Sequence, residues 1–129
     1  EKQNTTVSAV GGLTLGADPI ALATAMASHM ANDDPSLKPF VVRKEPKGHG
    51  KGKQIEGGFQ AGDRVVAIDD VITSGGSTLQ AIDIIEKDGG EVAFVVVLVD
   101  RQEGGRENIE KAGYPVFPLF TRDQLLSAE

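Results

Sequence analysis

Two runs of consecutive apolar residues constrain the fold of this chain more than any other feature. Val65–Ile68 and Val92–Val99 are strand-length apolar runs without polar alternation, and for Val92–Val99 this pattern predicts a strand buried on both faces. Between them, Leu79, Ile82 and Ile85 recur at helical spacing. A strand, a helix and a second buried strand in this order predict a parallel sheet with helices packed against it.

The rest of the chain continues this alternation, so we expect one α/β domain over residues 1–129, with an open, mainly parallel sheet flanked by helices. Further strands are expected at Val7–Val10, Pro39–Val42 and Val116–Phe120, and further helices at Pro19–Met30, Glu107–Ala112 and Arg122–Leu126. The predicted N-caps of the first two helices are Asp18 and Ser77. The predicted stops of the second and third are Gly89-Gly90 and Gly113.

Four loops follow predicted strands and are therefore expected at one edge of the sheet. They are Gly11–Gly16, Arg43–Gly58, Asp69–Gly76 and Asp100–Gly105. Ligands of open α/β sheets bind beyond the carboxyl ends of the strands. The long second loop has no periodicity and little apolar content, so no regular structure is expected in it.

Charge narrows the class of ligand. The net charge of −6 argues against nucleic acid, yet five of the 13 Lys and Arg residues lie between Arg43 and Lys53. This clustering favours a small anionic ligand, although a charge run taken alone is also typical of a solvated loop. No apolar run is long enough to span a membrane, and there is no cysteine. We expect a soluble, cytoplasmic protein.

The segment Asp69–Thr78 carries the chemistry. Two carboxylates end a strand, and hydroxyl residues with Gly75-Gly76 then lead into a helix. Backbone N–H groups at a helix N-terminus bind anions such as phosphate, and carboxylates suit ribose hydroxyls or hydrated Mg²⁺. An Asp-Asp or a Gly-Gly pair alone would indicate only an ordinary strand-to-helix connection. The spacing matches neither a Walker motif nor Gly-x-Gly-x-x-Gly.

Three stretches of this sequence are similar to motifs of known enzymes. Asp69–Ser77 resembles the phosphoribosyl pyrophosphate (PRPP) motif of the type I phosphoribosyltransferases. Phe40–Gly50, with Arg-Lys-x-x-Lys-x-His-Gly, looks like the catalytic loop of the orotate phosphoribosyltransferases, and Val99–Gly105 resembles their Asp-Arg-Gln-Glu stretch. The resemblance extends from about Val7 to the C-terminus.

The resemblance implies a role for each matching residue. Asp69 and Asp70 would hold the ribose hydroxyls of PRPP and, indirectly, Mg²⁺. Thr73 and Arg101 would contact orotate. The 5′-phosphate loop would be Val71, Ile72, Thr73, Ser74, Gly75, Gly76 and Ser77, and the residues closing over pyrophosphate would be Arg43, Lys44, Lys47 and His49. Lys47, His49, Asp69 and Asp70 would be catalytic. A homodimer is also implied, with the Arg43–Gly58 loop acting across the interface.

The implied reaction transfers phosphoribosyl from PRPP to orotate, a step of pyrimidine biosynthesis, with Mg²⁺ as cofactor. Two features depart from the family pattern: Leu15 stands where many members carry lysine, and only Glu1–Thr6 precedes the first predicted strand, where the family has a hood segment. We therefore expect a truncated form, processed or engineered. The alternatives are a PRPP-binding regulatory module without base turnover, and a phosphoribosyltransferase for another nucleobase.

Overall fold

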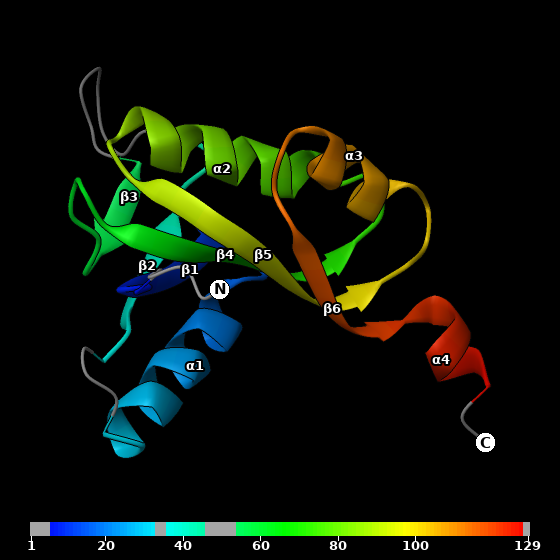
Figure 1. The fold of residues 1–129 in the computed structure, drawn as a ribbon, viewed down its shortest axis with the longest axis horizontal. Helices are drawn as coiled ribbons and strands as arrows, with labels where there is room; N and C mark the ends of the chain where they lie inside the picture. Colours follow the sequence, from blue (N-terminus) through cyan, green and yellow to red (C-terminus); the bar gives the residue numbers. More distant parts are fainter. Residues whose placement is uncertain (1–5, 33–35, 46–53, 128–129) are drawn as a thin grey trace.

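Six strands form one sheet in the order β3-β2-β1-β4-β5-β6 in the computed structural model, which describes residues 6–32, 36–45 and 54–127 (Figure 1). The strands are β1 (Ala9–Leu13), β2 (Lys38–Val42), β3 (Ile55–Gly57), β4 (Arg64–Ile72), β5 (Glu91–Asp100) and β6 (Val116–Thr121). The helices are α1 (Asp18–Met30), α2 (Gly76–Lys87), α3 (Gly105–Lys111) and α4 (Arg122–Leu126). The predicted class, an open and mainly parallel sheet flanked by helices, is confirmed.

The direction of strand addition reverses between β1 and β4. These two strands pair in parallel, but the chain leaves β1 toward β2 on one side and leaves β4 toward β5 and β6 on the other. Among the six strands of the described residues, β3 alone runs antiparallel, along the outer edge of β2. In open α/β sheets such a reversal opens a crevice at the carboxyl ends of the two diverging strands.

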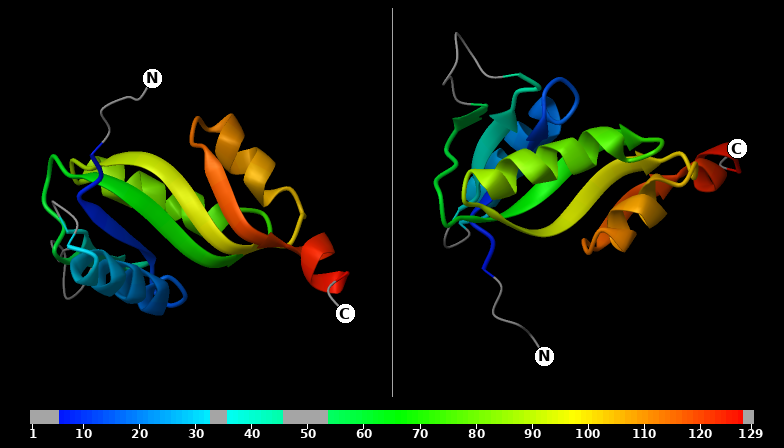
Figure 2. Two further views of the ribbon diagram at one scale, coloured as in Figure 1. Left: turned by 60° about the horizontal axis from the view of Figure 1, so that its bottom comes forward. Right: turned by 90° about the horizontal axis from the view of Figure 1, so that it is seen from above.

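Helices cover both faces of the sheet, but not evenly (Figures 1 and 2). On one face, α2 and α3 lie over the main core, which contains Phe40, Ile85 and Ile109, each at most 2% exposed. On the other face, α1 packs its small residues, including Ala21 and Ala25, over β1, β2 and β4. None of the helices in the described ranges is long and apolar enough to cross a membrane.

Strand β5 is buried more deeply on one face than on the other. Val95 and Val97 are 0% exposed beneath α2 and α3, as the apolar run predicts. On the opposite face Phe94 is partly buried and packs edge-on against Phe117, with ring centroids 5.4 Å apart. Phe117 is itself 55% exposed because α1 does not extend over this part of the sheet. The prediction of burial on both faces is therefore only half correct.

Both predicted N-caps are wrong. Helix α1 begins at Asp18 with Ala17 as its N-cap, since the carboxylate of Asp18 accepts a hydrogen bond from Thr14 Oγ1 at 2.8 Å instead of capping the helix. Helix α2 begins at Gly76, and its N-cap is Gly75 rather than Ser77. The predicted helix stops are confirmed, because Gly89 and Gly113 follow the C-caps of α2 and α3 with positive φ.

Three strand assignments also differ from the prediction. Strand β1 includes Gly11 and Gly12, since these glycines let β1 approach its neighbours: a Cβ on Gly12 would collide with the carbonyl oxygen of Ile68. Strand β4 continues through Asp69 and Asp70 to Ile72, which the sequence assigned to a loop. Part of the predicted structureless loop is strand β3, which pairs with β2 from Ile55 to Gly57.

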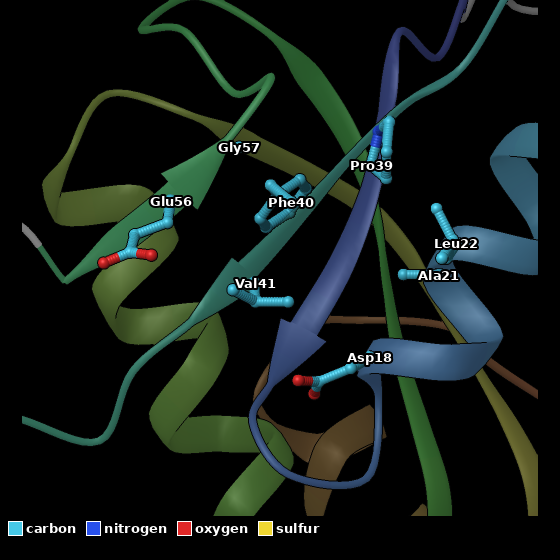
Figure 3. A pocket seen from close by; sticks show the side chains of 8 residues that line it. All are labelled: Asp18, Ala21, Leu22, Pro39, Phe40, Val41, Glu56 and Gly57. Atoms are coloured by element: carbon cyan, nitrogen blue, oxygen red, sulfur yellow. The ribbon is translucent and has the colours of Figure 1, made fainter.

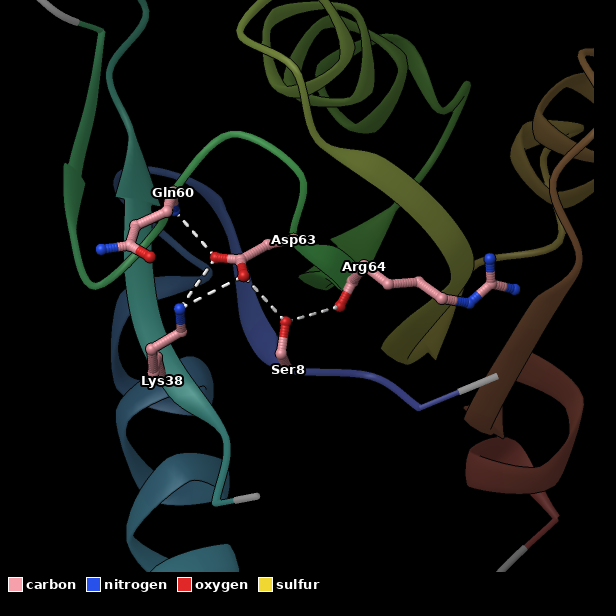
Figure 4. Close-up of polar contacts among 5 residues, drawn as sticks. All are labelled: Ser8, Lys38, Gln60, Asp63 and Arg64. Carbon is pink, nitrogen blue, oxygen red and sulfur yellow. Dashed lines mark hydrogen bonds and ion pairs between the residues drawn. The ribbon is translucent and has the colours of Figure 1, made fainter. Parts of the chain in front are cut away.

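At the edge opposite the crevice, Asp63 ties the amino ends of three strands together (Figure 4). Its carboxylate accepts hydrogen bonds from Ser8 Oγ before β1, from Lys38 Nζ in β2 and from the N–H of Gln60. Burial by itself would raise the pKa of Asp63, but the hydrogen bonds from Gln60, Lys38 and Ser8 outweigh it and hold the pKa below its usual value.

Candidate functional site

A small polar pocket lies where β4 passes into α2. Its volume is about 70 Å³, and it is lined by Asp69, Val71, Ile72, Thr73, Ser74, Gly75, Gly76, Ser77 and Thr78. The first N–H groups of α2 have no partner inside the helix, and the helix dipole places partial positive charge there. Hydroxyl groups, backbone donors and a positive helix end together form a cradle that suits a phosphate group. The structure thus brings the predicted phosphate-loop residues together around one cavity.

The two carboxylates at the end of β4 have different surroundings. Asp69 is 8% exposed: its Oδ1 accepts a hydrogen bond from the N–H of Asp70 and its Oδ2 accepts one from Thr78 Oγ1, both at 2.8 Å. Burial raises the pKa of Asp69, outweighing the hydrogen bond from Thr78 that favours the charged form. Asp70 is half-buried, and its Oδ1 accepts a hydrogen bond from the N–H of Val71 at 2.7 Å.

The loop after β1 meets the end of β4 at the crevice. Gly16, with φ of +130°, lies beside Asp70, so that a Cβ on this glycine would be 3.2 Å from Asp70 Oδ1. Leu15, the residue that stands in place of a family lysine, is 90% exposed. Asp70 therefore lies between the two loops that diverge at the reversal in strand order, where a ligand could contact both.

The loop after β5 is tied to the same place. The N–H of Arg101 donates to the carbonyl of Ile72, the last residue of β4, at 3.1 Å. The Arg101 side chain is 52% exposed and pairs with Glu103 Oε2 at 3.3 Å. Buried Asp100 accepts a hydrogen bond from the N–H of Gln102, whose own side chain accepts one from the N–H of Asp123 in α4. The backbone of Arg101, the predicted base-contacting residue, is thus hydrogen-bonded to the end of β4, the strand that leads into the pocket.

The predicted cationic lid lies only partly in the described structure. Arg43 and Lys44 follow β2; the guanidinium of Arg43 pairs with Glu56 Oε2 at 3.4 Å, and Gln54 Nε2 donates to both backbone carbonyls. Lys47 and His49 lie outside the described residues. The structure does not bring Arg43 or Lys44 into the lining of the phosphate pocket.

A larger hollow, of about 360 Å³, lies between α1 and strands β2 and β3 (Figure 3). Its charged residues are Asp18 and Glu56, and the rest of its lining is apolar or glycine: Ala21, Leu22, Pro39, Phe40, Val41 and Gly57. The lining contains no Lys or Arg side chain, and Arg43, which pairs with Glu56, lies outside it, so the hollow has no excess positive charge to attract an anion. Despite its size, this hollow does not match the chemistry predicted from the sequence.

Among residues 6–32, 36–45 and 54–127, no group of three or more His, Asp or Glu side chains gathers to hold a metal ion. Asp69 and Asp70 alone would give an incomplete Mg²⁺ site. Mg²⁺ commonly binds through one or two carboxylates together with substrate phosphates and water, so this pair fits the ion when a phosphorylated ligand supplies further oxygens.

Sequence reasoning missed the residues that support the cradle from behind. Asn108 Nδ2, in α3, donates to the carbonyl of Ser74 at 2.9 Å, and Gly105 packs against Thr73 and Gly75. Asn108 is 34 positions from its partner on an exposed helix surface, and no local pattern marks it. One feature of the sequence could have pointed to Gly105: it belongs to the Gly-Gly pair that directly follows Asp-Arg-Gln-Glu.

A small polar pocket at a reversal in strand order is typical of nucleotide-binding α/β proteins. Residues 19–117 match the phosphoribosyl transferase domain, and the chain belongs to that family. It is similar to the orotate phosphoribosyltransferases, as the sequence motifs indicated. It is 56% identical over 118 residues to that enzyme of Aquifex aeolicus, covering 92% of this chain, and 44% identical over 128 residues to that of Thermococcus kodakarensis, covering 98%.

Solved structures of orotate phosphoribosyltransferases also match the fold of this chain. Mycobacterium tuberculosis orotate phosphoribosyltransferase in complex with PRPP is 37% identical, with a TM-score of 0.81 over 95% of this chain and 67% of that one. The same enzyme in complex with inorganic phosphate gives a TM-score of 0.80 at 38% identity, over 93% of this chain and 63% of that one. This chain spans 63% of the Aquifex relative and 64% of the Thermococcus relative.

Proposed function

We propose that this chain forms the PRPP-binding domain of an orotate phosphoribosyltransferase, which transfers phosphoribosyl from PRPP to orotate and releases orotidine 5′-monophosphate and pyrophosphate. The observation that carries the proposal is the polar pocket at Thr73–Ser77, with Asp69 and Asp70 at the end of the strand that leads into it. Relatives with this enzyme's name match more than nine-tenths of the chain.

In this proposal the pocket holds the 5′-phosphate of PRPP. Hydroxyls of Thr73, Ser74 and Ser77 and the first N–H groups of α2 would donate to the phosphate oxygens. Asp70, between the two loops, would accept hydrogen bonds from the ribose hydroxyls, together with Asp69 beneath it. These contacts would fix the sugar while leaving its anomeric carbon open toward the base.

The base would lie on the Arg101 side. A guanidinium can bind a carboxylate through two parallel hydrogen bonds, which suits the carboxylate of orotate. Arg101 is paired with exposed Glu103, a contact of low strength that orotate could replace. Thr73, at the start of the cradle, would contact the same base.

The leaving pyrophosphate gathers negative charge, and the proposed lid would stabilise it. Arg43 and Lys44 follow the strand beside β1, and Lys47 and His49 come next in the chain. We propose that the Arg43–Gly58 segment acts on the site of a second subunit in a homodimer. This arrangement would also account for Arg43 lying outside the pocket of its own chain.

Mg²⁺ would be held by the oxygens of PRPP, with Asp69 and Asp70 as its protein partners, and would neutralise charge on the pyrophosphate. In this proposal the chain itself holds the carboxylates of Asp69 and Asp70 in position. The hydrogen bonds from Thr78 and from the N–H of Val71 do so.

Calorimetric titration with PRPP and Mg²⁺, followed by orotate in the same cell, tests the proposal. We expect PRPP to bind, and orotate then to give heat of reaction together with orotidine 5′-monophosphate detectable by chromatography. Asp70→Asn should weaken PRPP binding at least tenfold, while Asp88→Asn, an exposed aspartate at the far end of α2, should leave it unchanged. Absence of PRPP binding would contradict the whole proposal, and binding without product would restrict it to a PRPP-binding module.

A further inference from the structure

The cradle loop is held from outside by one side chain of α3. Asn108 Nδ2 donates a 2.9 Å hydrogen bond to the carbonyl oxygen of Ser74. We propose that Asn108 is a positioning residue: it fixes the peptide between Ser74 and Gly75 in the orientation that presents the N–H of Gly75 to a bound phosphate. This inference rests on the proposed function and adds a role for a residue outside the sequence motif.

This peptide needs an external restraint because it precedes a glycine. Gly75 has a φ of +86°. A flip of the Ser74–Gly75 peptide would bring that angle to negative values, which glycine adopts about as readily. Any other residue at this position would favour one of the two orientations through its Cβ atom. With glycine at position 75, the local sequence favours neither orientation of the Ser74–Gly75 peptide.

A trans peptide is planar, so its carbonyl and its N–H point in opposite directions. A hydrogen bond that draws the carbonyl of Ser74 toward Asn108 therefore directs the N–H of Gly75 away from the Asn108 side chain. Because a carbonyl can only accept, the partner atom must be the amide nitrogen of Asn108. Gly75 lines the phosphate pocket, where an inward N–H would add a donor and a flipped peptide would place a carbonyl oxygen facing the anion.

Close backbone packing lets Asn108 reach the loop. A Cβ on Gly105 would lie 2.5 Å from the carbonyl oxygen of Thr73, and one on Gly75 would lie 3.0 Å from the carbonyl oxygen of Gly105. The first turn of α3 thus rests directly on the cradle with no side chain between them. Ile109, 0% exposed, anchors that turn in the main core. A rigid element therefore supports the hydrogen bond.

The loop's own hydrogen bond is a weaker restraint. The N–H of Gly76 donates to Ser74 Oγ at 3.4 Å, close to the limit for such a bond. It holds the side chain of Ser74 and leaves the orientation of its carbonyl undetermined. The shorter bond from Asn108 acts on the carbonyl itself.

The test titrates the ¹⁵N-labelled chain with inorganic phosphate and follows the amide signals of Gly75, Gly76 and Ser77. For the unsubstituted chain we expect all three signals to shift. Asn108→Ala should lower phosphate affinity about 3- to 10-fold, the effect of one ordinary hydrogen bond, and should abolish the Gly75 shift while keeping that of Ser77. Alanine favours helix more than asparagine, so α3 itself should not weaken.

Two further variants complete the design. Asn108→Gln keeps an amide donor and should restore part of the affinity and the Gly75 shift. Glu107→Asp, a charge-conserving change at an exposed neighbour in the same turn, should have no effect. Equal affinity and an unchanged Gly75 shift in Asn108→Ala would overturn this inference alone. If the unsubstituted chain bound no phosphate, the proposed function would be overturned and this inference with it.

Discussion

Gly16 lies directly against Asp70: a Cβ atom at Gly16 would be 3.2 Å from Asp70 Oδ1. The two residues belong to the loop after β1 and to the end of β4, the pair of adjacent strands from which the chain diverges. Their contact joins the loop after β1 to the end of β4 at the crevice. It also places an acidic side chain where any ligand that bridges the two loops must pass.

Gly16→Ala should weaken PRPP binding by about tenfold, because the new methyl group would displace the Asp70 carboxylate. The substitution also forces alanine to a φ of +130°, which costs about 1 kcal/mol or more of stability. Gly62→Ala separates the two effects, since Gly62 has a φ of +95° with nothing within 4 Å of its Cβ position. Calorimetry and urea unfolding of both variants should show two destabilised proteins, of which only Gly16→Ala has lost affinity. Equal PRPP affinities would refute the proposed contact effect.

Thr78→Val should destabilise the fold and weaken binding of ribose 5-phosphate. The change keeps the shape of a buried side chain but removes the hydroxyl that donates to Asp69 Oδ2. A lost hydrogen bond to a buried carboxylate costs about 1.5–3 kcal/mol, which urea unfolding can measure. Thr78→Ser keeps the donor and loses one methyl group, so its cost should be near 1 kcal/mol with ligand affinity retained. A valine variant as stable as the serine variant would contradict this account.

Asp63→Asn should lower stability at pH 7 by about 1–3 kcal/mol, since the charge that holds Lys38 is removed. The pKa of Asp63 is depressed below 3.8 in the folded state, so its contribution is complete above that pH and disappears as the pH falls through the lowered folded pKa. Urea unfolding at pH 7, 4 and 3 should therefore show the two proteins converging in acid.

The control for that prediction is Asp83→Asn. Asp83 pairs with Lys87 at 3.0 Å on the exposed surface of α2, where both side chains are more than half exposed. Exposed pairs at this spacing contribute only about 0.3–0.5 kcal/mol, so this variant should stay close to the parent at every pH. A constant gap between Asp63→Asn and the parent from pH 7 to pH 3 would argue against a role for the charge.

Gln102→Ala should loosen α4. The side chain of Gln102 accepts a hydrogen bond from the N–H of Asp123 at 2.9 Å, and α4 contributes no buried residue of its own. Amide hydrogen exchange at Asp123 should therefore become several-fold faster, with no change in α2. Gln80→Ala, a change at an exposed glutamine of α2, is the matched comparison. If exchange at Asp123 kept its rate, α4 would be held by its capping box alone.

Local sequence signals predicted much of the fold. The bounds of α4 coincide with the prediction, and the Thr121–Gln124 capping box explains why this short helix is well defined. Strand β3 could not be predicted in the same way. It is three residues long, and its regular structure comes from pairing with β2 rather than from its own side chains.

The candidate site, too, could be predicted from the sequence only in part. The cradle from Asp69 to Ser77 was predicted because one continuous segment carries its carboxylates, hydroxyls and glycines. Its support from α3 was not predicted, because Asn108 approaches from another element and only the folded chain brings it there. The N-cap predicted for α1 was wrong for a related reason. Asp18 has the residue type of an N-cap, but its carboxylate accepts a hydrogen bond from Thr14 instead.

The pairing of β2 with β3 has a consequence for the segment that joins them. The N–H of Arg43 donates to the carbonyl of Gln54, and the side chain of Gln54 donates to the carbonyl of Arg43. Two hydrogen bonds therefore join the two ends of this segment. The entropy lost in bringing the two ends of a loop together is therefore spent when the protein folds. A ligand that binds residues of this segment therefore does not have to supply, from its binding energy, the entropy of bringing Arg43 and Gln54 together.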